Sequence, residues 1–335
     1  TPELLGLAMG AYGLTQALLQ IPFGRWSDRF GRKPVIAVGL GLFAVGSLIG
    51  ALANTVAMLA VARCVQGAGA VSAAVSALLA DLTRPEVRTR AMAVIGASIG
   101  LSFVLALVLA PVLDGVIGVP GIFAVMLVMA VGGLALLVFA VPAEPERTGG
   151  AESRSLSGLL ELARRPALMP LYAGVFALHF IMTATFLSVP QALVTDLGLA
   201  AASHWKVYLG VFVASLAGTI PLILATERTG RGPALFLAAI LAVAAAQALL
   251  GLDHGHLWVV LGGLTLFFAG FNYLEARLPA QLTLAAPDGD RGAALGIFAT
   301  AQFLGAFLGG ALGGVLLGRF GLAGVFWGSA AIALA

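Results

Sequence analysis

The stretch Gly24-Arg25-Trp26-Ser27-Asp28-Arg29-Phe30-Gly31-Arg32-Lys33 stands between two apolar runs, residues 3–24 and 34–54. Each run is long enough for a helix that crosses a bilayer, which needs about 20 mostly apolar residues. Gly31 allows a tight reversal of the chain, and Gly24 allows a neighbouring helix to approach closely. The pattern therefore predicts two membrane helices joined by a short basic turn.

The composition of the whole chain is that of a membrane protein. The 335 residues are 60% hydrophobic and 10% charged, with a net charge of +3 and a mean hydropathy of +1.05. A soluble domain carries about 25% charged residues, and a disordered chain needs low hydrophobicity, so both classes are excluded. The basic residues stand in short loops, which does not indicate nucleic-acid binding. Cys64 is the only cysteine, so no intrachain disulfide or thiolate metal site is expected.

Apolar runs without strand alternation predict about ten complete membrane helices and one partial helix that begins near Gly321. One set of loops holds fourteen basic residues, whereas the alternate set holds only Lys206 and Arg319. Positive charge marks the cytoplasmic side, so residue 1 is predicted to lie outside. An outer start without a signal pattern leads us to expect a further helix upstream of Thr1, and the last run is expected to be truncated. The predicted spans are 3–24, 34–54, 56–80, 90–113, 120–142, 167–193, 205–226, 233–252, 257–280 and 292–317.

The two halves of the chain resemble each other at an offset near 200. Residues 28–34 match 227–233, and residues 90–96 loosely match 291–296, in the same order on the cytoplasmic side. This repetition favours two six-helix bundles related by a pseudo-two-fold axis along the membrane normal. The predicted parts are an N-terminal bundle (1–142), a cytoplasmic linker (143–166) and a C-terminal bundle (167–335). Within the linker, the leucines of residues 156–163 have helical spacing, which fits an interfacial helix or a regulatory docking helix.

The basic turn 24–33 resembles motif A of the major facilitator superfamily, G-x-L-x-D-R-x-G-R-[KR], with tryptophan in place of leucine. Residues 59–70 resemble motif B, whose buried arginine is linked to proton coupling in the family. Residues 81–93, 271–276 and 302–305 are similar to the YajR-type subgroup of drug/proton antiporters. The resemblance covers essentially the whole chain and implies an all-α fold, with the present spans as helices 2–12 of twelve. Motif C is looser, since Gly96 and Gly100 are in place but Ala110-Pro111 and Asp114-Gly115 stand at the far end.

Ionisable side chains within the predicted spans are functional candidates, because a charge at bilayer depth costs about 3 kcal/mol or more. Arg63 and Gln66 share a helix face that we expect to turn toward a central cavity, although a purely structural Arg63 is an alternative. Glu275 is either a titrating cavity carboxylate or an interfacial partner of Arg277, and His179 either titrates or serves as a packing residue. The candidates for proton coupling and substrate binding are Arg63, Gln66, His179, Asn272 and Glu275.

Motif A predicts a cytoplasmic gate. We expect Arg32 to pair with Asp81, and Asp28 to face the start of the helix at Gly292 and Ala293. Such contacts would hold the two halves together on the inside and favour an outward-open state. The candidate gate residues are Gly24, Asp28, Arg29, Gly31, Arg32, Asp81 and Gly292. Glycine rows near the end of the chain predict close helix packing, and the packing candidates are Gly96, Gly100, Pro111, Gly305 and Gly309.

The predicted function is proton-coupled efflux of small amphipathic or drug-like compounds by alternating access, in a bacterial inner membrane. A monomer in the lipid bilayer, driven by the proton gradient and without cofactor, metal or nucleic-acid partner, is expected. An importer or uniporter of a small metabolite is one alternative, and a non-transporting sensor or scaffold is another. An enzyme is not expected: residues 96–100 fit the G-x-S-x-G pattern, but a nucleophile elbow needs a strand–turn–helix context.

Overall fold

The computed structural model describes residues 1–142, 156–287 and 290–335, and these contain helices but no strand. Nine of the described helical segments are long and apolar enough to cross a membrane. The elements are α1 (Pro2–Phe30), α2 (Arg32–Ala51), α3 (Val56–Gly67), α4 (Ser72–Leu82), α5 (Pro85–Phe139), α6 (Leu156–Ala163), α7 (Met169–Thr195), η1 (Ala201–Ser203), α8 (His204–Thr229), α9 (Gly232–Leu252), α10 (Leu257–Ala285) and α11 (Arg291–Leu334).

The predicted span 56–80 is confirmed as a membrane span at Val56–Leu79. It is not a single helix, because residues 68–71 separate α3 from α4. Glycines flank this break and let it lie directly on neighbouring backbones. A Cβ added at Gly67 would strike the carbonyl of Tyr12 on α1, and one at Gly69 would strike the carbonyl of Gly39 on α2. The break is therefore a place where the chain approaches α1 and α2 more closely than a regular helix with side chains allows.

Two pairs of predicted spans follow each other without an intervening loop, within α5 and within α11. Spans 90–113 and 120–142 both belong to α5, and 292–317 is followed within α11 by the span that begins near Gly321. Gly118 (φ 65°) and Gly321 (φ 67°) have positive φ at the two junctions, where the helical direction breaks. Glycine adopts this backbone conformation without the steric cost that other residues carry.

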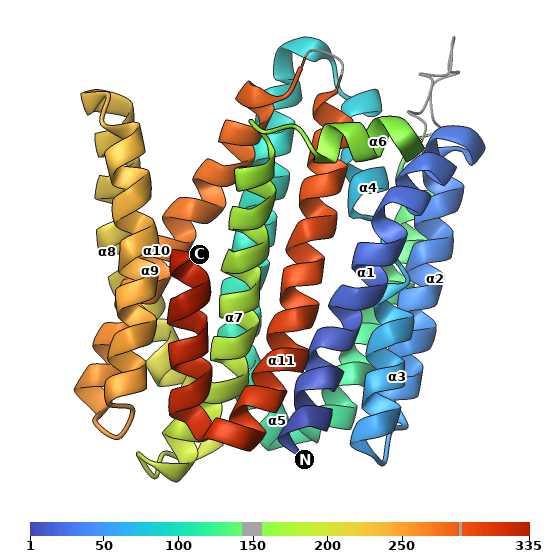
Figure 1. Ribbon diagram of the computed structural model, residues 1–335. Helices are drawn as coiled ribbons and strands as arrows, with labels where there is room; N and C mark the ends of the chain where they lie inside the picture. The colour runs from blue at the N-terminus through green and yellow to red at the C-terminus, as the bar shows by residue number, and fades with distance from the viewer. Residues whose placement is uncertain (143–155, 288–289) are drawn as a thin grey trace.

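The helices form two groups that meet along α1, α7 and α11 (Figure 1). The two groups also meet where α5 contacts α8 and η1. Helices α1–α4 lie on one side, α8–α10 lie on the other, and α7 and α11 stand between them. The largest hydrophobic core lies among α7–α11 and includes Phe267, Phe268 and Tyr273. The predicted linker helix is present as α6, whose Leu162 is fully buried in this core. Helix α6 contacts α11 and is thus docked on the second half of the chain, while residues 143–155 of the predicted linker lie outside the described residues.

Helix α11 is held between α7 and α1 by two stripes of glycine. The first stripe lies on the backbone and side chains of α7, where an added Cβ at Gly305 or Gly309 would strike the carbonyl of Phe176 or Phe180. The second stripe lies on α1, where the backbones of Gly310 and Gly314 meet the backbone around Gly6 and Gly10. The predicted close packing of Gly305 and Gly309 is therefore present, and only residues without a Cβ fit at these contacts.

The contact between α1 and α11 closes one end of the molecule. The two helices converge toward the end that holds the N-terminus, which the positive-inside pattern places outside (Figure 1). Near the cytoplasmic start of α11, by contrast, an added Cβ at Gly292 or Gly296 would meet no heavy atom within 4 Å. The two halves are therefore joined at the outer end, an inward-facing arrangement.

Candidate functional site

The imidazole of His179 lies where α7, α10 and α11 meet. Its Nδ1 is 3.2 Å from the carbonyl oxygen of Val175, and its Nε2 is 2.8 Å from the side-chain amide Nε2 of Gln302. The carboxylate oxygen Oε2 of Glu275 lies 3.9 Å from the same Nε2, and the ring packs against Phe271 with centroids 5.8 Å apart. His179 has only 6% of its surface exposed. Three helices thus bring a base, an acid and an amide into one cluster inside the membrane.

Glu275 faces His179 and does not pair with Arg277. The Oε2 atom of Glu275 is buried without a hydrogen-bond partner, and so is Nε of Arg277. Residues two apart on a helix point in different directions. The Arg277 guanidinium accordingly reaches toward the start of α9, where its Nη2 would lie 3.8 Å from a Cβ added at Gly232. The structure therefore favours Glu275 as a carboxylate within the helix bundle over Glu275 as the partner of Arg277.

Asn272 stands one turn before Glu275 on α10. Its Nδ2 is 3.5 Å from Oγ of Ser215 on α8, at the outer limit of hydrogen-bond distance. Asn272 thus contacts α8, whereas Glu275 contacts α7, so the predicted shared polar face serves two neighbouring helices.

Arg63 and Gln66 form a second polar cluster, in the first half of the chain. Arg63 Nη1 donates to Gln66 Oε1 at 3.1 Å, and the guanidinium lies 4.7 Å from the centre of the Tyr12 ring. Gln66 is fully buried and donates to Ser47 Oγ at 2.9 Å, so it points into the packing between α2 and α3. The expectation that Gln66 faces a central cavity is therefore wrong. Arg63 comes closer to the other half, since Tyr12 contacts the ring of Phe303 on α11 edge to face.

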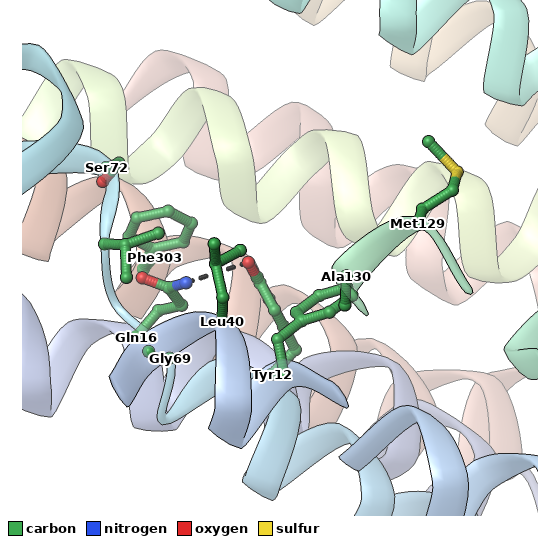
Figure 2. A pocket seen from close by; sticks show the side chains of 11 residues that line it. Tyr12, Gln16, Leu40, Gly69, Ser72, Met129, Ala130 and Phe303 are labelled. Atoms are coloured by element: carbon green, nitrogen blue, oxygen red, sulfur yellow. Dashed lines mark hydrogen bonds between the residues drawn. The ribbon is translucent and has the colours of Figure 1, made fainter. Parts of the chain in front are cut away.

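A cavity of about 360 Å³ lies beside this cluster, between α1, α2, the break at 68–71 and α5 (Figure 2). Its wall is mostly apolar, and Phe303 of α11 lines it from the other half of the molecule. Tyr12 and Gln16 supply the polar groups, joined by a hydrogen bond of 2.8 Å from Gln16 Nε2 to the Tyr12 hydroxyl (Figure 2). Oε1 of Gln16 is buried without a partner. Apolar walls with few polar groups are typical of small-molecule sites.

The motif A cluster lies at the cytoplasmic ends of α1, α2 and α4. Arg32 contacts Asp28 Oδ1 at 2.5 Å, Asp81 Oδ2 at 3.3 Å and Ser27 Oγ at 2.7 Å. The predicted contact between Arg32 and Asp81 is thus present. It joins α2 to α4 within the first half, so the expectation that this contact holds the two halves together is wrong. Gly292 faces open space, since an added Cβ there would meet no heavy atom within 4 Å, and its predicted approach to Asp28 is not seen.

The remaining predicted gate and packing residues have varied surroundings. Gly31 has φ 96° and makes the predicted reversal between α1 and α2, and exposed Arg29 stacks on the neighbouring Phe30. An added Cβ at Gly24 or Gly100 would meet nothing within 4 Å, so the close packing expected there is absent. The surroundings of Gly96 lie outside the described part of the chain, and Pro111 is a partly exposed residue within α5.

Two residues of the site were not among the predicted ones. Gln302 was noted only as part of a family-like stretch, and Tyr12 not at all, because neither carries a charge at neutral pH. A search for every polar side chain within an apolar span, rather than for charges alone, would have found both.

These features define a class of protein: a polytopic α-helical membrane protein whose two halves meet around glycine-lined helices, with a histidine–carboxylate pair among the helices of one half. The family model for the Major Facilitator Superfamily matches residues 1–278. The chain therefore belongs to the major facilitator superfamily and is a membrane transporter of that family; its relatives are transporters and not enzymes.

Individual relatives agree with this assignment. The chain is 40% identical to the inner membrane transport protein YajR of Escherichia coli. The similarity extends over 331 residues, which are 98% of this chain and 73% of that protein. It is 31% identical to an uncharacterized transporter of Buchnera aphidicola, over 91% of this chain and 78% of the relative. Among solved structures, the human organic anion transporter MFSD10 superposes with a TM-score of 0.73 at 20% identity, over 98% of this chain and 82% of that structure. This last likeness concerns the fold alone.

Proposed function

We propose that this transporter is a proton-coupled antiporter that exports small amphipathic compounds by alternating access across a bacterial inner membrane. The observation that carries the proposal is the pair formed by His179 Nε2 and Glu275 Oε2, 3.9 Å apart within the helix bundle. A buried base beside a carboxylate whose nearer oxygen is buried can hold one proton between them at low energetic cost, whereas an isolated charge at that depth is expensive.

A cavity in the first half of the chain supports the proposed binding of the exchanged compound. The cavity beside Tyr12 is mostly apolar, and only Gln16, Tyr12 and Ser72 bring polar side chains to its wall. These groups offer hydrogen bonds to a neutral polar group on an apolar body. A strongly charged sugar phosphate or dicarboxylate would require more basic residues on such a wall. Small, weakly polar, amphipathic cargo is therefore the class that the cavity favours.

The arrangement of the halves supports alternating access. The outer ends are joined by backbone contacts between α1 and α11, and nothing lies against Gly292 and Gly296 at the cytoplasmic end. In this inward-facing state cargo would enter from the cytoplasm, and a rocking motion that separates α1 from α11 would release it outside. A proton that enters from outside and binds at His179 and Glu275 would then drive the return.

The test is transport by the full chain in proteoliposomes with an imposed pH gradient and a panel of amphipathic compounds. We expect wild-type protein to move at least one compound against its gradient, and Glu275→Gln and His179→Asn to lose the dependence on the pH gradient. Glu161→Gln on the exposed surface of α6 and His256→Asn in an outer loop are matched controls and should behave as wild type. Equal gradient dependence in Glu275→Gln and wild type would refute proton coupling at this pair, and downhill transport alone would indicate a uniporter.

A further inference from the structure

The hydrogen bonds around His179 determine which ring nitrogen carries its proton. Nδ1 lies 3.2 Å from the carbonyl oxygen of Val175, one turn earlier on the same helix. A carbonyl oxygen can only accept a hydrogen bond, so Nδ1 must be the donor. In the neutral ring Nε2 is then the unprotonated nitrogen, and its lone pair needs a donor.

Gln302 supplies that donor from α11. Its side-chain nitrogen Nε2 lies 2.8 Å from His179 Nε2, and the amide NH₂ group donates to the lone pair. The ring is thus held from both sides, by its own helix and by α11. This bond stabilises neutral His179 in the orientation in which the free nitrogen also faces Glu275.

A proton bound at His179 Nε2 reverses this contact. Two N–H donors would then point at each other across 2.8 Å, which is repulsive. The repulsion is relieved when the Gln302 amide turns over and presents its oxygen, or withdraws and leaves the new N–H to Glu275. Glu275 is the only carboxylate that the described chain places within 4.0 Å of the ring, the Phe271 ring is apolar, and Arg277 points toward α9.

The position of Gln302 on α11 gives this reversal a mechanical consequence. Phe303, the next residue, contacts α1 through its backbone, because its carbonyl oxygen lies 2.7 Å from a Cβ added at Gly13. Its ring also touches Tyr12 edge to face. Gln302 therefore lies at the cytoplasmic edge of the interface that joins the two halves at the outer end.

We propose that Gln302 is a positioning residue that holds His179 as the Nδ1-protonated base and must turn its amide over when His179 takes up a proton at Nε2. The inference rests on the proposed function, in which His179 and Glu275 form the proton site. Beyond that function, the inference specifies that the proton binds at Nε2 of His179 and that α11 responds through Gln302.

The test is nitrogen NMR of the full chain, labelled with ¹⁵N-histidine and reconstituted in lipid nanodiscs, over a range of pH. The His179 resonances are identified by their loss in His179→Asn. At high pH the wild-type protein is expected to show a protonated Nδ1 and an unprotonated Nε2. The opposite tautomer in wild-type protein would overturn the proposal without any need for a variant at position 302.

Variants of Gln302 add a second measurement, the pH midpoint of the His179 resonances, which a purely structural role of Gln302 would leave unchanged. Gln302→Glu offers an acceptor and a charge, so the pH midpoint of the His179 resonances should rise by about one unit or more. Gln302→Leu only removes the donor and should raise the midpoint by less. Gln191→Glu on α7, whose amide bonds to the carbonyl of Leu187, is the matched control and should leave the midpoint unchanged. An unchanged midpoint in Gln302→Glu would refute the proposal.

These outcomes separate the inference from the proposed function. The expected tautomer and midpoints together with transport that ignores the pH gradient would refute proton coupling and leave the positioning role standing. Gradient-driven transport together with a neutral His179 ring that carries its proton on Nε2 would refute the positioning role of Gln302 and leave proton coupling standing.

Discussion

The contact between α1 and α11 predicts that one methyl group can open the outer end of the molecule. A Cβ added at Gly310 would lie 2.5 Å from the carbonyl oxygen of Gly6 and 3.1 Å from Cα of Gly10. Cβ contacts shorter than 3.0 Å are essentially never seen, so Gly310→Ala must separate the two helices by at least about half an ångström. Because the obstacle is backbone, no side chain can rotate away to relieve the contact.

The cost of this overpacking falls on the closed outer end alone. Overpacking a tight contact costs about 1–3 kcal/mol, and alanine improves helix propensity by about 1 kcal/mol in either state, so the second effect cancels. A change of 1.4 kcal/mol is tenfold in an equilibrium constant, so the ratio of inward-facing to outward-open molecules should fall about 5- to 150-fold.

The assay is pulsed electron paramagnetic resonance across the outer end. Spin labels on Asn54→Cys and Gly255→Cys, in a Cys64→Ser background, report the distance between exposed outer turns of the two halves. We expect longer distances in Gly310→Ala than in the parent protein. Gly296→Ala, on the same helix but facing open space, is the matched control and should keep the parent distances. Identical distance distributions in Gly310→Ala and Gly296→Ala would refute the reasoning.

Two further predictions concern a buried amide and an outer loop. Gln66→Leu removes the acceptor of Arg63 Nη1 and should destabilise the protein by about 1–3 kcal/mol, measured as a lower Tm in detergent against Gln191→Leu, and equal Tm values would contradict this. In the outer loop, desolvation raises the pKa of Asp253, but hydrogen bonds from the Gly255 N–H and from His256 together outweigh it and hold that pKa below its usual value. Asp253 therefore stabilises the loop above its ordinary pKa, and protection of the Gly255 amide from hydrogen exchange should weaken as pH falls through the lowered pKa. In Asp253→Ala, which has no side-chain acceptor, this protection should be absent at every pH. Protection that does not change with pH in the wild-type protein would exclude this role.

Much of the fold could be predicted from local features of the sequence. Apolar runs of about 20 residues predicted the membrane helices, because each backbone polar group in lipid must bond within its own helix. The exceptions depend on tertiary contacts: residues 68–71 leave the helix where Gly67 and Gly69 meet the backbones of α1 and α2. The boundaries of the two bundles at residues 142 and 167 stay a prediction, as does a gating role for motif A.

The site was predicted in part, for a similar reason. Arg63 and Gln66 contact each other as expected, since residues three apart on a helix are neighbours. His179 and Glu275 were each predicted separately, but 96 residues separate them, and no helical spacing relates them. Gln302 was not predicted because an amide carries no charge. Its role becomes visible only in the folded structure, where it lies beside His179.

The sequence by itself determined that the chain crosses a membrane, which loops are cytoplasmic and which family it resembles. These properties depend on hydropathy, charge and short motifs, all of which are local. The tertiary structure alone decided that His179, Glu275 and Gln302 meet, that one glycine stripe of α11 packs on α7 and the other on α1, and that the outer end is closed. Contacts between distant helices depend on how their surfaces fit together, and a linear pattern of residues does not specify that fit.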